Sequence, residues 1–243
     1  MGAANNPFLE LLTMNDRGEG HTFKRFDGQL SNLHLMVTKM GQSVHQQVQD
    51  ALTAFRTQDI ALAQKVLARH SDIDRMELAA DAEIVEVIAR NSPLASDLRL
   101  VVAVSKSVGD LQKIGEEATR MALLLEEIRL ESSTPLIESL MDGVDRMGVL
   151  VLSHLDTAVG LFDQWDEQKA LYVIAGHQRM DGDFQAELHR VMTCLLEESL
   201  DVKAAVRLVL LAKSLDRIIH HALNLAEYAM FEIYGGFDLS SEA

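Results

Sequence analysis

The first long stretch that predicts a single element reads LSNLHLMVTKMGQSVHQQVQDALTAF over residues 30–55. Its apolar side chains recur at spacings of three and four residues, which is the period of an α-helix with one apolar face. They are Leu30, Leu33, Val37, Met40, Val44, Val48, Ala51 and Phe55. Further stretches rich in Ala, Leu, Met, Glu, Gln and Lys follow, and because these residues favour helices, the sequence predicts an all-α protein.

Composition limits the partners and the compartment. The chain has 243 residues, 48% of them hydrophobic, which is enough for a packed core. Its 22 Lys and Arg against 37 Asp and Glu give a formal net charge of −15, which repels nucleic acids and anionic lipids. A single cysteine, Cys194, excludes an internal disulfide and fits a reducing compartment. We see no signal peptide or membrane-spanning run, so neither nucleic-acid binding nor direct membrane insertion is expected.

Start and stop signals divide the rest of the chain into further helices. Asp59 is expected to begin a second helix that runs to about Ala89, and Ser96 or Asp97 is expected to cap a third. The second half repeats this order. Thr134 would cap a helix begun by Pro135, Asp166 would open another, and a last helix would run from about Asp201 to Tyr234, before Gly235 and Gly236.

The two halves also match residue by residue. Ala51, Phe55, Asp59, Ala63 and Val66 reappear 107 positions later as Ala158, Phe162, Asp166, Ala170 and Val173, and the third helices match with an offset of 104 positions. This predicts a domain duplication: two up-down-up three-helix bundles, over residues 21–130 and 134–237, with a pseudo-twofold or screw relation. The junction is expected at residues 130–134, with a flexible tail over residues 1–20 and a second tail over residues 238–243.

Polar side chains are predicted to gather in one groove of each bundle. In an antiparallel helix pair, facing residues have position numbers that add up to a constant set by the turn, and residues four apart on one helix share a face. By this rule two sets lie abreast, one between the second and third helices and one between the fifth and sixth. They are Glu77, Asp81, Gln112 and Glu116, and Asp181, Gln185, Asp216 and His220.

Oxygen-rich groups with an optional imidazole are the ligands that hard or borderline cations prefer. The first set, with three carboxylates, predicts a hard divalent cation such as Mg²⁺ or Mn²⁺, whereas the second, with an imidazole, suits Zn²⁺, Fe or Ni²⁺. A chain with 37 acidic residues also produces such pairs by chance, so solvated polar flanks are the alternative. His221 points away from the second groove, because adjacent helical residues are about 100° apart, and is expected on the surface or at its flank.

One segment is specific enough to indicate a family. ASDLRLV over residues 95–101, followed by Ser105-Lys106-Ser107 and Lys113-Ile114-Gly115-Glu116, resembles the PhoU family of bacterial phosphate-signalling regulators. The run from Leu52 to Asp59 and the Met76-Glu77-x-x-x-Asp81 segment add to the resemblance, which covers about His21 to Phe237. It implies a two-repeat plan of three-helix bundles and metal ligands at the eight groove positions.

The chain departs from the family pattern at those ligand positions. Gln112 stands where the family has an acidic residue, and Ile219-His220 replaces the usual Gly-Asp, so the Glu77 and Asp81 motif alone is intact. A neutral amide oxygen is a weaker ligand than a carboxylate, and Ile219 adds bulk where close approach is needed. Bound metal would therefore be fewer in number, different in kind or absent.

The resemblance implies a function as well. A PhoU-like chain would be a cytoplasmic adaptor with no reaction of its own, which represses phosphate-starvation signalling by contacting a sensor histidine kinase and the ATPase of a phosphate transporter. We also expect a homodimer. Two alternatives stay open: a divergent relative that regulates another transporter or signalling system, and a metal-dependent hydrolase that uses the cluster around Glu77 and Glu116.

Overall fold

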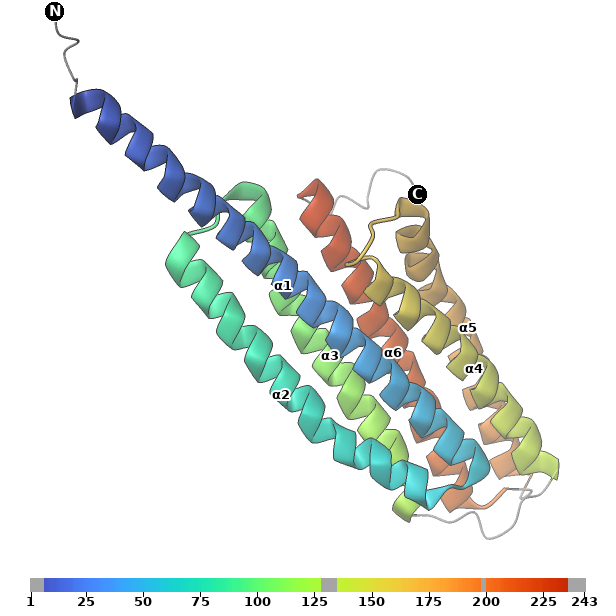
Figure 1. The fold of residues 1–243 in the computed structure, drawn as a ribbon. Coiled ribbons are helices and arrows are strands. Elements are labelled where there is room, and N and C mark those ends of the chain that lie inside the picture. Colours follow the sequence, from blue (N-terminus) through green and yellow to red (C-terminus); the bar gives the residue numbers. More distant parts are fainter. Residues whose placement is uncertain (1–6, 128–134, 198–199, 236–243) are drawn as a thin grey trace, which may run out of the picture.

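A computed structural model describes residues 7–127, 135–197 and 200–235, and these residues form six long α-helices and no strand (Figure 1). The all-α prediction is therefore confirmed. The helices are α1 (Pro7–Thr57), α2 (Ile60–Asn91), α3 (Ala95–Glu127), α4 (Pro135–Gly160), α5 (Glu167–Leu196) and α6 (Val202–Tyr234).

Side chains at the helix ends explain most of these boundaries. The carboxylate of Asp59 accepts a hydrogen bond from the backbone N–H of Leu62 at 3.0 Å, and Asp166 accepts one from Lys169 at 3.1 Å. Asp201 caps α6 in the same way, which satisfies backbone donors that have no partner within the helix. Gly235 ends α6 with a φ of 77°, a left-handed conformation that glycine adopts without strain. These predicted starts and stops are confirmed.

Two predicted boundaries differ from the structure. Helix α1 begins at Pro7, so part of the tail expected over residues 1–20 belongs to this helix, and Figure 1 shows it projecting beyond the bundle. Proline suits this position because its fixed φ fits the first helical turn. Helix α3 begins at Ala95, which places Ser96 and Asp97 in its first turn and not at its cap. The predicted Thr134 cap and the predicted junction at residues 130–134 lie outside the described residues.

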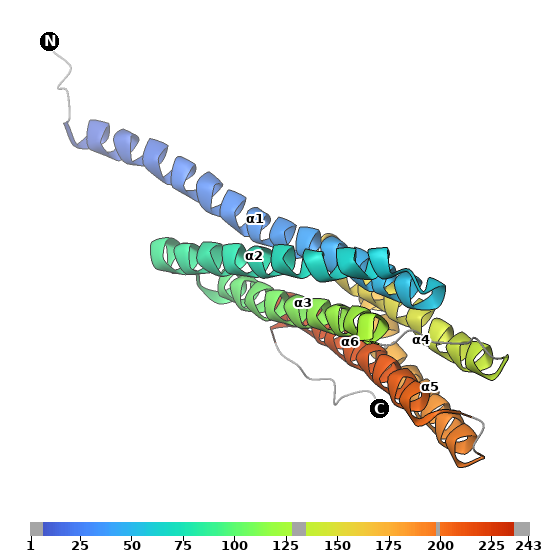
Figure 2. The same cartoon turned by 90° about the horizontal axis from the view of Figure 1, so that it is seen from below.

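The helices form a ring of four with two outer helices. Within the described residues α1 packs on α3, α3 on α6, α6 on α4, and α4 on α1, which closes the ring. Helix α2 covers α1 and α3, whereas α5 covers α4 and α6 (Figures 1 and 2). Each half is thus a three-helix unit, as predicted, but the buried side chains of both halves join in one continuous core.

Close contacts between α1 and α4 show that the halves are related by pseudo-twofold symmetry. A Cβ added to Gly41 would lie 2.5 Å from both methyl carbons of Val159, and one added to Gly148 would lie 2.9 Å from a methyl carbon of Leu52. With the offset of 107 positions, Gly41 corresponds to Gly148 and Leu52 to Val159. The two contacts are therefore the same contact made in both directions, as in a twofold-symmetric interface.

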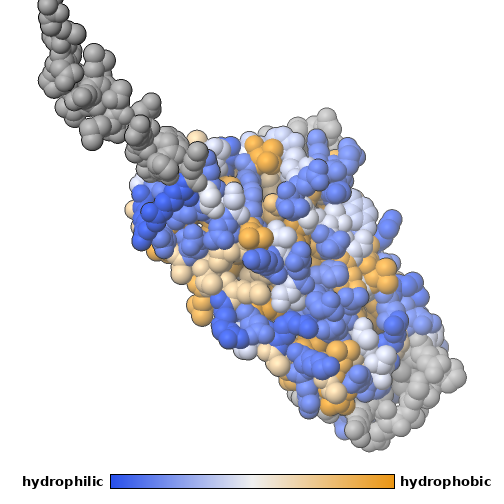
Figure 3. All heavy atoms as spheres, in the orientation of Figure 1, coloured by the Kyte–Doolittle hydropathy of each residue, from blue (hydrophilic) through white to orange (hydrophobic). Residues whose placement is uncertain are grey.

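The outer surface combines hydrophilic and apolar side chains. On the face shown in Figure 3, hydrophilic side chains cover much of the helices and are interrupted by separate apolar patches. No helix in the described part of the chain is long and apolar enough to cross a membrane.

The glycine contacts predict a stability effect. We expect Gly41→Ala to lower the free energy of unfolding by about 1–3 kcal/mol, because the new methyl group would force α1 away from Val159. Gly28→Ala is the matched control on the same helix, since nothing lies within 4 Å of its added Cβ, and it should be neutral or stabilising. Urea unfolding of the three proteins measures this; equal losses in both variants would contradict the close approach of α1 and α4.

Candidate functional site

The first predicted set meets in the groove between α2 and α3. Gln112 Nε2 donates to Glu116 Oε1 at 3.2 Å and lies 3.4 Å from Asp74 Oδ1. Partial burial of Glu77, together with the negative charges of Asp81, Asp74 and Glu116, raises the pKa of Glu77. The four predicted residues are therefore close enough to interact electrostatically, and Asp74 joins them.

The second set is only partly brought together. His177, Asp181, Asp216 and His220 line one cavity between α5 and α6, whereas Gln185 is exposed and is not part of its lining. His177 Nε2 lies 3.1 Å from His220 Nδ1, and His177 Nδ1 lies 3.6 Å from Asp181 Oδ2. With His221, Lys213 and Arg217, which also line it, the cavity presents three imidazoles, two carboxylates and two cationic side chains.

In neither groove do the potential ligand atoms converge on one point. Across residues 7–127, 135–197 and 200–235, no three His, Cys, Asp or Glu side chains are placed to hold one metal ion. In the first groove the Gln112 amide group donates to the carboxylate of Glu116, and in the second Lys213 Nζ lies 2.5 Å from Asp216 Oδ2. The donor types fit divalent cations, but these contacts would have to open before the oxygens could converge.

The predicted sets leave out Asp74 in the first groove and His177 in the second. Asp74 precedes Glu77 by three positions, and His177 precedes Asp181 by four. Both spacings place the side chain on the face of the predicted ligand. The helical spacing rule alone, extended by one turn, would have found them.

A second polar cluster lies where the repeats meet, between α3 and α6. Asp110 is 3% exposed and accepts hydrogen bonds from the Asn224 amide at 3.1 Å and from His221, whose Nδ1 lies 3.0 Å away. Burial alone would raise the pKa of Asp110, but the hydrogen bonds of His221, Asn224 and Tyr228 and the charge of His221 lower it to about 2. Asp110 is thus held as a buried carboxylate.

Glu117 is the buried carboxylate of the symmetry-related contact. It is 4% exposed, accepts a hydrogen bond from Ser214 at 3.0 Å and one from Arg217 at 3.1 Å, and is also paired with Arg120. With the offset of 104 positions, Asp110 corresponds to Ser214 and Glu117 to His221. The Asp110–His221 and Glu117–Ser214 pairs are therefore one contact repeated by the pseudo-twofold axis. His221, expected on the surface or at the flank of the second groove, is partly buried there: it lines the second cavity and also contacts Asp110 across the interface.

Comparison with known proteins agrees with this architecture. The model of the PhoU domain matches residues 37–125 and again residues 144–229, one match in each repeat. The chain belongs to the PhoU family. The predicted resemblance is thus confirmed, and both matched segments fall within the two three-helix units of the structure.

Relatives of this PhoU family member match along most of their length. It is 28% identical over 215 residues to the phosphate-specific transport system accessory protein PhoU of Escherichia coli (strain K12), covering 88% of each chain. A homologue of that accessory protein in Pseudomonas aeruginosa is 31% identical over 217 residues, again covering 88% of each chain.

Solved structures share the fold. The crystal structure of PhoU from Pseudomonas aeruginosa matches with a TM-score of 0.82 at 31% identity, covering 87% of this chain and 100% of that one. The phosphate transport system regulatory protein PhoU from Streptococcus pneumoniae matches with a TM-score of 0.79 at 20% identity, covering 87% and 98%. The second match, at that identity, supports the fold alone.

The buried cluster predicts a second stability effect. We expect Asp110→Ala to lower the free energy of unfolding by about 1–3 kcal/mol, because His221, Asn224 and Tyr228 would lose their shared acceptor. Asp183→Ala removes an exposed carboxylate of α5 and should change stability by less than about 0.5 kcal/mol. Thermal unfolding at pH 7 measures both, and equal melting temperatures of the two variants would contradict the role of Asp110.

Proposed function

We propose that this protein is a regulator of phosphate transport and phosphate-starvation signalling, which acts as a non-catalytic adaptor. The observation that carries the proposal is the match over 88% of both chains to an accessory protein of a phosphate-specific transport system. Its partners would be a sensor histidine kinase and the ATPase of a phosphate transporter. It would act in the cytoplasm as a homodimer.

The architecture supports binding as the main activity. Six long helices in one continuous core form a rigid body with extended side faces, the kind of surface that recognises another protein. The buried carboxylates Asp110 and Glu117 are already engaged by donors from the opposite repeat. They therefore serve the packing of the repeats and leave recognition to the outer side chains.

Deletion of the gene tests the regulatory role. We expect expression of phosphate-starvation genes to rise in phosphate-rich medium when the repressor is absent. A copy that lacks residues 1–18 should restore repression, because the matched PhoU segments begin at residue 37. Reporter activity in the deletion strain and in both complemented strains measures this. Unchanged reporter activity on deletion would instead favour a relative that regulates another system.

We also propose that the two grooves take up metal in this role. Glu77, Asp81 and Glu116, with the Gln112 oxygen once its amide has turned, would hold a hard divalent cation such as Mg²⁺ or Mn²⁺. Asp181, Asp216 and His220, with Gln185 nearby on the same helix face, would suit Zn²⁺, Fe or Ni²⁺. The raised pKa of Glu77 supports the first site, since a cation there would relieve repulsion among neighbouring carboxylates.

Elemental analysis tests the metal proposal. Protein purified without a histidine tag should lose metal in a Glu77→Ala/Asp81→Ala/Glu116→Ala variant, and separately in an Asp216→Ala/His220→Ala variant, because each removes charged or imidazole ligands. The metal-to-protein ratio of each variant is compared with that of the wild type. Equal ratios in all three proteins would mean that the grooves are solvated polar flanks.

A further inference from the structure

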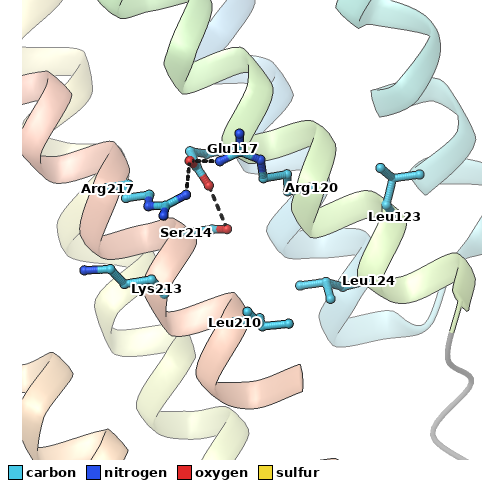
Figure 4. A pocket seen from close by; sticks show the side chains of 8 residues that line it. All are labelled: Glu117, Arg120, Leu123, Leu124, Leu210, Lys213, Ser214 and Arg217. Carbon is cyan, nitrogen blue, oxygen red and sulfur yellow. Dashed lines mark hydrogen bonds and ion pairs between the residues drawn. The ribbon is translucent and has the colours of Figure 1, made fainter. Parts of the chain in front are cut away.

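A cavity of about 270 Å³ opens between the C-terminal half of α3 and the N-terminal half of α6 (Figure 4). Its lining combines apolar and cationic side chains in separate parts. Leu123, Leu124 and Leu210 form the apolar part, and Arg120, Lys213 and Arg217 surround Glu117 and Ser214. This cavity adjoins the second predicted groove, with which it shares Lys213 and Arg217 in its lining.

Within the lining, three cationic side chains surround a single carboxylate, that of Glu117. Glu117 is buried, whereas the side chains of Arg120 and Arg217 are 49% and 50% exposed. Figure 4 shows both guanidinium groups reaching toward this one carboxylate. Each guanidinium carries five N–H donors, so donors remain on the solvent side of both arginines. Outside the lining, Glu116 lies 3.6 Å from Arg120, and Asp216 pairs with Lys213.

The pseudo-twofold axis provides an internal comparison, because different side chains occupy the symmetry-related position around Asp110. With the offset of 104 positions, Leu124 corresponds to Tyr228 and Leu123 to Glu227. Tyr228 hydrogen-bonds to Asp110, and Lys106 Nζ lies 5.2 Å from the centre of its ring. Tyr228 and Lys106 are larger than the leucines at their equivalent positions, Leu124 and Leu210, which leave space beside Glu117. The duplication alone therefore does not account for the cavity.

An exposed apolar stripe leads into the cavity along α6. Val202, Val206 and Leu210 are spaced four residues apart, and their exposed fractions are 61%, 51% and 46%. At about 1.5 Å of rise per residue the stripe extends roughly 12 Å, which is similar to two turns of a partner helix. Across the groove Leu123 of α3 is also exposed.

We propose that the α3–α6 groove around Arg120, Arg217 and the Val202–Val206–Leu210 stripe docks an amphipathic segment of a partner protein. The segment presents an acidic side chain between aliphatic ones. Its aliphatic side chains cover the stripe and the leucines, and its carboxylate accepts hydrogen bonds from the unused arginine donors. The unused N–H donors of these two half-exposed arginines favour a segment that carries a carboxylate over a basic one.

This inference rests on the proposed adaptor function, since it names the surface through which the partners bind. A photo-crosslinking residue is placed at Val206 and, as a control, at Val149, which is 70% exposed on α4. Each full-length protein is mixed with the purified cytoplasmic part of the sensor kinase and with the purified transporter ATPase. Binding of the unmodified protein is measured first, and the crosslinked peptides are then mapped by mass spectrometry.

We expect crosslinks from Val206, and none from Val149, to a partner peptide that carries Asp or Glu beside aliphatic residues. Binding of neither partner by the unmodified protein would overturn the adaptor function itself. Binding without a partner crosslink from Val206 would overturn the docking site and leave the adaptor function standing. Crosslinks from Val206 to this chain, to a second copy of it or to a basic peptide would likewise overturn the docking site.

A charge reversal tests the electrostatic half of the proposal. We expect Arg217→Glu to weaken partner binding by about tenfold or more, and exchange of the partner's acidic residue for arginine to restore it. Lys113→Glu is the matched control, because Lys113 is the equivalent residue in the first repeat. It is 57% exposed, pairs with the buried Asp110 as Arg217 pairs with Glu117, and should change binding less than threefold. Far-UV circular dichroism checks that both variants fold. Equal weakening by both variants would show a general charge effect and overturn the proposal.

Discussion

The packing of the two repeats depends on two buried carboxylates at the contact between α3 and α6. A buried charge is costly unless it is hydrogen-bonded and paired, so Asp110 and Glu117 each require donors from the opposite repeat. A shift of either helix along the other would leave both carboxylates buried without these donors. The hydrogen bonds therefore determine the register of α3 against α6, and through these two helices the arrangement of the whole ring.

The same symmetry allows the two ends of the interface to differ. At one end the buried Asp110 is hydrogen-bonded by His221, Asn224 and Tyr228. At the other end Glu117 is covered by half-exposed arginines beside leucines, and a cavity remains. The backbone relation is shared, because the glycine contacts between α1 and α4 are also repeated. Duplication has thus produced a symmetric scaffold whose side chains differ from one half to the other.

This separation of scaffold and surface agrees with the comparisons. A relative at only 20% identity keeps the fold with a TM-score of 0.79, so the packing tolerates extensive change in side chains. Groove positions are among the residues that differ between the repeats. In this PhoU family member the first groove is rich in carboxylates, whereas the second is lined by three imidazoles. The two grooves therefore offer different ligand chemistry on equivalent backbones.

The sequence by itself determined the helices, because their apolar period, their aspartate caps at Asp59, Asp166 and Asp201, and Gly235 act within a few residues of chain. It also placed Glu77, Asp81, Gln112 and Glu116 in one groove, since a single short turn joins the two adjacent antiparallel helices that carry them. The contact between repeats was different. The partners of Asp110 and Glu117 are about 100 residues away, and no local period shows which helices of the two halves meet. Only the tertiary structure decided that α3 faces α6, that His221 is part of the interface, and that Gln185 is exposed outside the lining of its predicted groove.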